Sequence, residues 1–316
     1  MKVLVTGANG FVGHAVCRRL VAEGWNVAGA VRRQTTLEAG TEPRHIGEIG
    51  PDTNWDATLV GVEAVVHLAA RVHVMEDKAA DPLAAFRRVN TEGTLRLAEA
   101  AAKAGVKHFV FMSSIKVNGE ATAPGHPFRA DDLVAPEDPY GRSKWEAEQG
   151  LAEISVRTGM VVTILRPPLV YGPGAGGNLR ALMTFLGKGL PLPLGLVDNR
   201  RSLLGVENLA DAVACCLRAE PKGCGTYLLR DGEDVSTSGL IRILSEGLGK
   251  QPRLLPVPPA LLRLAGGLLG KKPAIDRLLG SLQVDDSDFR SRFGWASPIT
   301  LRDGLLGMAE GFRYRS

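Results

Sequence analysis

A glycine-rich turn directly after the first apolar run is the feature that most constrains the fold of this chain. Residues 3–5 (Val-Leu-Val) read as a buried strand, and the turn that follows is Thr-Gly-Ala-Asn-Gly-Phe-Val-Gly. Apolar residues then recur at helical spacing over residues 11–23, and residues 27–31 form a second buried run. Strand, turn, helix and strand make a βαβ unit, which requires parallel strands and a crossover helix.

Each glycine of the turn has a physical role. Gly7 permits the tight turn out of the strand, Gly10 lets the backbone approach a pyrophosphate, and Gly13 lets the helix pack close to the sheet. The helix start offers free N–H groups and the positive end of its dipole to phosphate groups. The strand before and the helix after make a dinucleotide site more specific than an ordinary tight turn. The other predicted contacts of this turn are Asn9, Phe11 and Val12.

Strands and helices continue to alternate up to Arg166. Strands are predicted at 63–68, 107–112 and 160–165, and helices at 82–104 and 139–158. This order predicts an α/β fold with a doubly wound parallel Rossmann-type sheet, covered by helices on both faces. Prolines and glycines then interrupt the pattern, with helices expected at 178–188, 206–219 and 238–248, a strand at 226–229 and an apolar helical segment at 256–280. We expect residues 1–166 to form an NAD(P)-binding domain and residues 167–316 a smaller substrate-binding lobe, some elements of which can return to the main sheet.

Composition narrows the classes of protein. The 316 residues suffice for one large α/β domain or two lobes, and 45% apolar with 23% charged residues indicates a folded globular chain. The net charge of +4 is spread along the chain, which suits a phosphate-bearing small molecule and argues against nucleic acid. The four cysteines have neither paired spacing nor accompanying histidines, so we expect no metal site and a reducing, cytoplasmic setting. No basic and apolar leader precedes the first strand, which fits that location.

Further motifs follow the glycine turn in order. They are Asn90 in a helical segment, Ser113-Ser114 at a strand end, Tyr140-x-x-x-Lys144 on a helix, and Arg166-Pro167-Pro168 continuing to Tyr171-Gly172-Pro173. Together with the Gly-x-x-Gly-x-x-Gly spacing, these motifs resemble the extended short-chain dehydrogenase/reductase family, also called NAD-dependent epimerases/dehydratases. The resemblance spans residues 1 to about 211 and is greatest to members that act at carbon 4 of UDP-sugars.

The resemblance makes Ser114, Tyr140 and Lys144 the predicted catalytic residues. Tyr140 and Lys144 are four residues apart on a predicted helix and therefore share one face. A free tyrosine has a pKa of about 10, and a neighbouring ammonium is expected to lower it. Tyr140 can then exchange a proton with a substrate oxygen to which Ser114 donates a hydrogen bond. The resemblance also implies that Lys144 holds the nicotinamide ribose and that Asn90 organises water near Lys144.

The end of the second strand favours NADP(H), with NAD(H) as the alternative. NAD-preferring members of the family usually carry an Asp where Val31 stands, and two arginines, Arg32 and Arg33, follow here. Either could pair with the 2′-phosphate of NADP, or both could be surface charges. Other predicted cofactor contacts are Glu48 and Ile49 at the adenine edge, Leu68, Ala69 and Ala70 in a segment whose backbone can approach the cofactor closely, and also Asn90, Tyr140, Lys144 and Pro167.

The substrate side is predicted from the same resemblance. Ile115 and Lys116 stand where sugar-nucleotide 4,6-dehydratases carry an Asp-Glu pair, so dehydration is disfavoured. Lys116 and Ser114 are expected to contact substrate. Asn178 is expected at the nucleotide diphosphate, although an Asn at a helix start can also be an N-cap. Arg201 matches the arginine that grips the diphosphate, and Arg277 is the candidate for a second such arginine.

Four functions fit these residues. The favoured one is reduction of a UDP-4-keto-6-deoxy-N-acetylhexosamine, of the UDP-N-acetylquinovosamine type, in surface glycan biosynthesis. Its main alternative is a UDP-glucose or UDP-N-acetylglucosamine 4-epimerase. Val31 and Asn118 argue for the reductase, because an acid at the first position helps an epimerase retain NAD and epimerases usually have Tyr at the second. A reductase of a non-nucleotide carbonyl and a non-enzymatic dinucleotide sensor are the remaining alternatives.

Two segments of the sequence concern association with a second subunit or with a membrane. The helix containing Leu95, Leu97, Ala98 and Ala101 often pairs with its copy in this family, so we expect a homodimer, although core packing explains the same residues. The apolar run at 257–270 carries Arg263 and is too short to cross a membrane, so no stable insertion is expected. Lys271 and Lys272 follow it, and the segment favours a core or interface helix over contact with a membrane surface.

Overall fold

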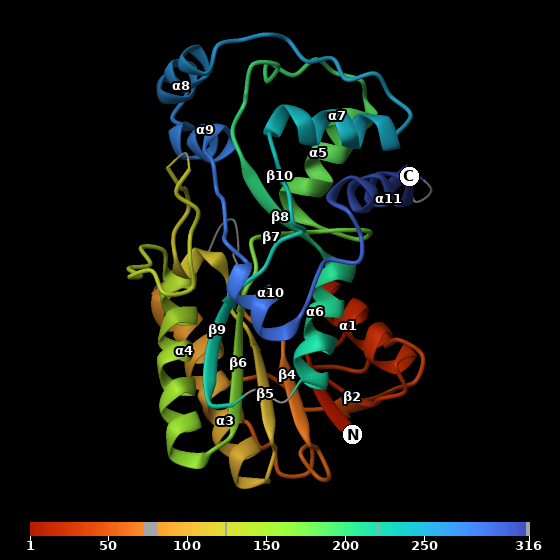
Figure 1. Cartoon of the computed structure of the whole chain (residues 1–316), viewed down its shortest axis with the longest axis vertical. Helices are drawn as coiled ribbons and strands as arrows, with labels where there is room; N and C mark the ends of the chain where they lie inside the picture. The colour runs from red at the N-terminus through yellow and green to blue at the C-terminus, as the bar shows by residue number, and fades with distance from the viewer. Residues whose placement is uncertain (73–80, 124, 220–221, 314–316) are drawn as a thin grey trace.

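Seven parallel strands form the main sheet of the computed structural model, which describes residues 1–72, 81–123, 125–219 and 222–313 (Figure 1). The strand order is β3-β2-β1-β4-β5-β6-β9, and every neighbouring pair is parallel. The strands are β1 (Lys2–Thr6), β2 (Asn26–Val31), β3 (Thr41–His45), β4 (Ala64–His67), β5 (His108–Met112), β6 (Val161–Arg166) and β9 (Cys224–Leu228). The predicted doubly wound sheet is confirmed, and β9 shows that the chain returns to it between two parts of the second lobe.

Helices cover both faces of this sheet (Figure 1). On one face lie α1 (Phe11–Ala22), α6 (Val206–Arg218) and α10 (Ser287–Phe293); on the other lie α3 (Gly93–Lys103) and α4 (Pro139–Thr158). Val3 and Val5 of β1 belong to the first core and Leu4 to the second, because successive side chains of a strand point to opposite faces. Burial on both faces explains why β1 reads as an uninterrupted apolar run.

The helix predicted at 82–104 is interrupted. It consists of α2 (Pro82–Phe86), a π-helical turn η1 (Arg87–Glu92) and α3. Asn90, the only buried residue of η1, lies in this wider turn. Short π-helical turns inside helices are frequently found at functional sites.

The second lobe lies above the carboxyl ends of the main strands (Figure 1). Its sheet has the order β10-β8-β7, with β7 (Leu169–Tyr171) parallel and β10 (Asp234–Val235) antiparallel to β8 (Arg201–Gly205). Around a third core pack α5 (Gly177–Gly187), α7 (Thr237–Gly247) and α11 (Leu301–Arg313). The segment predicted as helical at 256–280 forms two helices, α8 (Pro259–Leu268) and α9 (Lys272–Leu279), because Gly270 between them has a φ of +67°.

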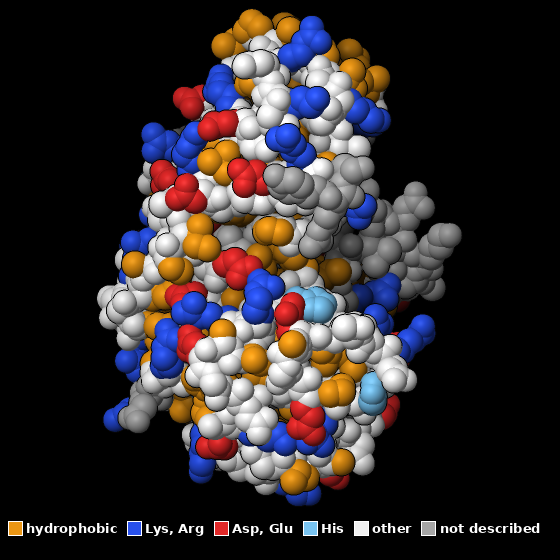
Figure 2. Space-filling model, turned by 90° about the vertical axis from the view of Figure 1, so that its right-hand side faces the viewer, with side chains coloured by type: hydrophobic (Ala, Val, Ile, Leu, Met, Phe, Trp, Pro, Cys, Tyr) orange, Lys and Arg blue, Asp and Glu red, His pale blue; other side chains and the backbone are white. Residues whose placement is uncertain are grey.

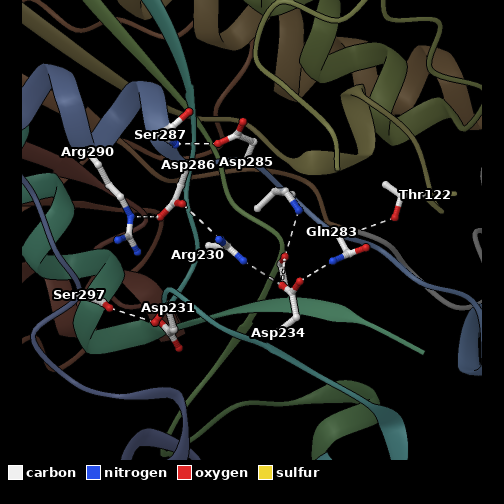
Figure 3. Close-up of polar contacts among 12 residues, drawn as sticks. Thr122, Arg230, Asp231, Asp234, Gln283, Asp285, Asp286, Ser287, Arg290 and Ser297 are labelled. Atoms are coloured by element: carbon white, nitrogen blue, oxygen red, sulfur yellow. Dashed lines mark hydrogen bonds and ion pairs between the residues drawn. The ribbon is translucent and has the colours of Figure 1, made fainter. Parts of the chain in front are cut away.

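Charged side chains join this lobe to the main sheet (Figure 3). Asp234 of β10 accepts a 2.6 Å hydrogen bond from the Gln283 amide, and Arg230 bonds both Asp234 (3.3 Å) and Asp286 (3.2 Å). Arg290 of α10 donates to Asp286 over 2.7 Å. A continuous polar network therefore runs from the small sheet to a helix that packs on the large one.

Candidate active site

The glycine turn has the geometry of a phosphate cradle. Gly7 has a φ of +67°, and a Cβ there would lie 3.0 Å from the Ala69 nitrogen. A Cβ on Gly13 would lie 2.1 Å from the Gly7 carbonyl oxygen, so only glycine fits. Helix α1 begins after the exposed Gly10, and no side chain of the described residues caps its first turn. The first-turn N–H groups are thus open to an anion, and these residues fit the pyrophosphate of a dinucleotide.

The loop after β4 forms the opposite wall of this cradle. The backbone nitrogens of Leu68 and Ala69 both donate to the Thr6 hydroxyl over 3.2 Å. The buried His67 ring bonds the hydroxyls of Thr6 (2.7 Å) and Thr94 (2.9 Å), which ties β1, β4 and α3 together. Burial, reinforced by the charge of Lys144, lowers the pKa of His67 to about 3, so the ring is neutral at neutral pH. His67 and Thr94 were not predicted as site residues, although a histidine inside an apolar strand was a signal.

The structure brings Ser114, Tyr140 and Lys144 together at the carboxyl end of β5. Helix α4 begins at Pro139, and the Asp138 side chain caps it by accepting from the Tyr140 and Gly141 nitrogens, both at 3.1 Å. Ser114 is the polar neighbour of the Tyr140 phenol that lowers its pKa. One helical turn later, the Lys144 ammonium donates to the Met112 carbonyl over 2.8 Å.

Burial dominates the pKa values of this group. Desolvation, with a smaller contribution from Asp138, raises the pKa of Tyr140 to about 12, against the lowering effect of the Ser114 hydrogen bond. Desolvation also lowers the pKa of Lys144 to about 7, against the attraction of Glu148. The expected lowering of the Tyr140 pKa by Lys144 is therefore wrong for the protein alone. The ammonium is bonded to Met112, lies 4.6 Å from the Phe111 ring centroid, and is itself poorly solvated.

A buried ion pair that the sequence analysis did not predict lies beside the catalytic group. Arg166 donates from Nε (3.0 Å) and Nη2 (2.5 Å) to the two carboxylate oxygens of Glu148, and the two side chains are 5% and 2% exposed. Glu148 also accepts from the Ser113 hydroxyl, and Arg166 donates to the Asn118 side chain over 3.0 Å. The pair thereby fixes Ser113, the neighbour of Ser114, against α4. A carboxylate four residues after Lys144, on the buried face of the same helix, was the signal for it.

Asn90 connects α4 to the loop after β4. Its amide donates to the Arg71 carbonyl (3.0 Å) and the Ser143 hydroxyl (3.1 Å), and its oxygen accepts from the Arg71 nitrogen (2.8 Å). Ser143 in turn donates to the Tyr140 carbonyl over 2.8 Å. These bonds hold the helical turn that carries Tyr140 and Lys144. The role of Asn90 toward water stays a prediction.

The predicted adenosine-side residues divide into exposed and buried ones. Arg32 and Arg33 are exposed after β2, and Arg32 Nη1 lies 3.4 Å from both oxygens of the exposed Glu48 carboxylate. Ile49 is 8% exposed and packs in the core with α3 and α4. Ala70 is half-buried in the loop after β4, and the buried Pro167 follows β6. Contact of each of these residues with a cofactor stays a prediction.

The predicted substrate residues have partners within the chain. Lys116 lies 3.1 Å from the Glu120 carboxylate and 3.7 Å from that of Asp138. Arg201 donates to the carbonyls of Arg277 (2.8 Å) and Gly280 (3.1 Å), at the end of α9. Asn178 is the exposed second residue of α5, whose N-cap residue is Gly176, so the N-cap alternative for Asn178 is wrong.

The residues expected at a dimer interface lie inside the single chain. Leu97, Ala98 and Ala101 are fully buried in the core beneath α3 and α4, and Leu95 lies against Gly150 of α4. Core packing accounts for all four residues. The predicted homodimer therefore has no support from them.

The part of the chain that the structure describes contains neither a cluster of metal-binding side chains nor a membrane-spanning helix. Residues 1–72, 81–123, 125–219 and 222–313 contain no group of three or more His, Cys, Asp or Glu side chains that could hold a metal ion. Among the same residues, no helix has both the length and the apolarity needed to cross a membrane.

Comparisons with known proteins agree with this geometry. The sequence profile of the NAD dependent epimerase/dehydratase family matches residues 3–227. A UDP-glucose 4-epimerase of Vibrio cholerae is 43% identical over 98% of this chain and 95% of its own length. The N-acetyl-alpha-D-glucosaminyl-diphospho-ditrans,octacis-undecaprenol 4-epimerase of Escherichia coli O157:H7 is 28% identical over 96% and 93%. Among solved structures, MoeE5 in complex with UDP-glucuronic acid and NAD is 26% identical, covers all of both chains and superposes with a TM-score of 0.79.

Proposed function

Because this chain is an enzyme of the NAD-dependent epimerase/dehydratase family, we propose that it is a UDP-sugar 4-epimerase acting on UDP-glucose or UDP-N-acetylglucosamine. The observation that carries the proposal is that Ser114, Tyr140 and the buried Lys144 lie together at the carboxyl edge of the sheet, where the Lys144 ammonium is bonded to the Met112 carbonyl at the end of β5. Ile115 and Lys116, which follow this group, cannot act as the acid pair of a dehydratase. The 43% identity to a UDP-glucose 4-epimerase supports the epimerase over the 4-ketoreductase that the sequence analysis favoured.

Different residues of the chain serve proton transfer, substrate binding and cofactor binding in the reaction at carbon 4. Tyr140 in its phenolate form takes the proton from the hydroxyl on carbon 4 and later returns it to the same oxygen, while Ser114 donates a hydrogen bond to that oxygen. A nicotinamide dinucleotide bound in the glycine cradle would supply the hydride acceptor and donor for carbon 4. Lys144 holds the nicotinamide ribose, and the buried Glu148–Arg166 pair holds the end of β6 against α4. Proton transfer at one oxygen thus serves both directions of the reaction.

We assign residues 1–166 to the cofactor and residues 167–316 to the substrate, with β9 returning to the main sheet. Asn178 and Arg201 contact the diphosphate, and Lys116 lies beside the sugar. The protein is cytoplasmic and forms a homodimer. The resemblance to the family supports these assignments.

Activity assays separate the two functions. Wild-type protein should interconvert UDP-glucose with UDP-galactose, or the N-acetylated pair, without added cofactor. Tyr140→Phe should lower this rate by roughly 100-fold or more, the scale for a lost general acid–base. Tyr227→Phe, which removes a hydroxyl from a ring that packs against Phe289 of α10, is the matched control and should keep the rate. NADPH oxidation with UDP-4-keto-6-deoxy-N-acetylglucosamine, without interconversion of either pair, would establish the reductase instead.

A preference for NADP(H) is a separate proposal, and it rests on Arg32 and Arg33. Their guanidinium groups are exposed at the end of β2, and the 3.4 Å pair of Arg32 with Glu48 is weak enough to exchange for a phosphate. The double variant Arg32→Ala/Arg33→Ala should weaken NADPH binding roughly tenfold or more and leave NADH binding unchanged. Fluorescence titration of both cofactors measures this, with the surface variant Arg157→Ala as control. Tighter binding of NADH than NADPH by the wild type would show that the arginines are surface charges.

A lipid-linked sugar diphosphate is a second candidate substrate. The E. coli O157:H7 relative is named for such a substrate, and helix α8 of the lobe that we assign to substrate exposes several leucines. Undecaprenyl-diphospho-N-acetylglucosamine in detergent should be assayed beside the UDP-sugars. Faster epimerisation of the lipid-linked sugar would favour this candidate.

A further inference from the structure

Helix α8 presents an apolar face that packs on no other part of the described chain. Leu261, Leu264 and Leu268 recur at helical spacing and are 55%, 62% and 81% exposed, and Leu269 after them is 72% exposed. Of the ten residues of α8, Gly266 alone is buried, and a Cβ there would lie 2.6 Å from Ile275 of α9. One side of α8 is thereby held against α9. The leucines lie on the remaining, exposed surface.

The segment around α8 is also uniformly basic. Residues 247–275 contain five cations and no Asp or Glu; the cations are Lys250, Arg253, Arg263, Lys271 and Lys272. Arg263 has only a distant carboxylate, Asp276 at 3.9 Å, and Lys271 and Lys272 form no ion pair with the described residues. Figure 1 places α8 at the upper end of the molecule, and Figure 2 views the molecule from the side opposite to α8. We call Leu261, Leu264, Leu268 and Leu269, together with Lys271 and Lys272, the α8 patch.

We propose that the α8 patch docks the enzyme on the surface of an anionic lipid bilayer. Leucines on one face and lysines at one end are the pattern of a helix that lies in the interface plane, with its apolar side at the headgroup–acyl boundary. The lysines reach anionic headgroups, each contributing roughly a fivefold gain in binding. At ten residues α8 is too short to span the bilayer, so it attaches the protein without inserting it.

The positive charges around the α8 patch argue against a second copy of the chain as its binding partner. A two-fold contact through the α8 patch would place each cluster of cations against its own copy, with no acidic residue of 247–275 to compensate. An anionic membrane offers both the apolar layer and the opposite charge.

Docking through α8 would also orient the substrate lobe. The end of α9, on which α8 packs, accepts hydrogen bonds from Asn199 (2.7 Å, to Gly280) and from Arg201 at the start of β8. The α8 patch and the proposed diphosphate contact are therefore joined by a single short helix. The docking surface itself is independent of the proposed function, because its test measures binding and not turnover.

Vesicle flotation of the full-length protein tests the proposal. The protein should float with vesicles that contain phosphatidylglycerol and stay behind with pure phosphatidylcholine, and high salt should release it. Leu264→Gln/Leu268→Gln should lower the partition coefficient roughly tenfold or more, and Lys271→Gln/Lys272→Gln roughly fivefold per charge. The matched control Leu133→Gln/Val156→Gln changes two exposed apolar residues elsewhere and should float like wild type. Circular dichroism and UDP-glucose turnover confirm that each variant folds.

Three results would overturn the proposal. They are failure to bind anionic vesicles, equal binding to both lipid compositions, and unchanged binding of the α8 variants. If vesicles do not bind and Leu264→Gln/Leu268→Gln converts a dimer to a monomer in light scattering, the face is a self-interface. For the wild-type protein, turnover without vesicle binding contradicts docking alone, and vesicle binding without turnover contradicts the proposed function alone.

Discussion

At the scale of single residues, the burial that places Lys144 beside Tyr140 also lowers the stability of the fold. Its ammonium is buried, and the Glu148 carboxylate, the Met112 carbonyl and the face of Phe111 compensate it. The folded state therefore holds the pKa of Lys144 at about 7, against an ordinary value of 10.5. Between these two pH values the unfolded chain binds a proton that the folded chain does not, so folding becomes more favourable as pH rises.

Replacing Lys144 should remove this pH dependence. Lys144→Met keeps much of the side-chain volume without a titratable group, and it should be more stable than wild type at pH 7 and below. The advantage should shrink by up to about 1.4 kcal/mol per pH unit as pH rises from 7 toward 10. Urea unfolding at several pH values measures it, with the exposed Lys103→Met as control. Parallel stability curves for wild type and Lys144→Met would show that the lysine stays charged in the fold.

The residues of the candidate site differ in how far the sequence could predict them. Ser114, Tyr140 and Lys144 were predictable because their spacing within one helix and at one strand end is local. The Glu148–Arg166 pair was not, because the packing of α4 on β6 brings the two side chains together. The direction of the Tyr140 pKa was also missed, since burial is a property of the fold and outweighs the neighbouring charge.

At the scale of elements, local patterns predicted the parallel core and the helices that follow it, but they missed the edge strand β3 and the short strands of the second lobe. Helix α4 begins and ends as predicted because Asp138 caps it before Pro139 and Gly159 ends it in the left-handed conformation, with φ of 75°. Strand β3 reads Thr-Glu-Pro-Arg-His, lies at the sheet edge and has no apolar alternation, so no periodicity could reveal it. Strands β7, β8 and β10 are short and are defined by their pairing to one another.

Helices α8 and α9 show what periodicity cannot decide. The apolar spacing of residues 256–280 predicted helix, and two helices form there. The same spacing favoured a core or interface position, whereas α8 is almost entirely exposed in the single chain. A hydrophobic period identifies an apolar face but not its partner.

At the scale of the whole molecule, the two lobes must keep a fixed relation for the substrate lobe to serve Tyr140. Strand β8 carries Arg201, and β10 pairs with it in the register Asp234–Ser202 and Val235–Arg201. The Asp234 carboxylate then connects this sheet to the segment that leads to α10 on the main sheet (Figure 3). Its loss should therefore affect both folding and substrate binding.

Removing the Asp234 carboxylate tests this coupling between the lobes. Asp234→Ala leaves the Ser202 hydroxyl and the Gln283 amide without their 2.6 Å acceptor and Arg230 with Asp286 alone. The free energy of unfolding should fall by about 2 kcal/mol or more, because the polar groups left behind are largely buried. The KM for the UDP-sugar should rise more than kcat falls, since Arg201 shifts while Tyr140 and Lys144 stay on α4. Asp234→Asn, which keeps one acceptor oxygen, should be intermediate, and Asp131→Ala on the surface should change neither quantity. Urea unfolding and steady-state kinetics measure the two effects, and an unchanged KM in a destabilised Asp234→Ala protein would show that the network serves folding alone.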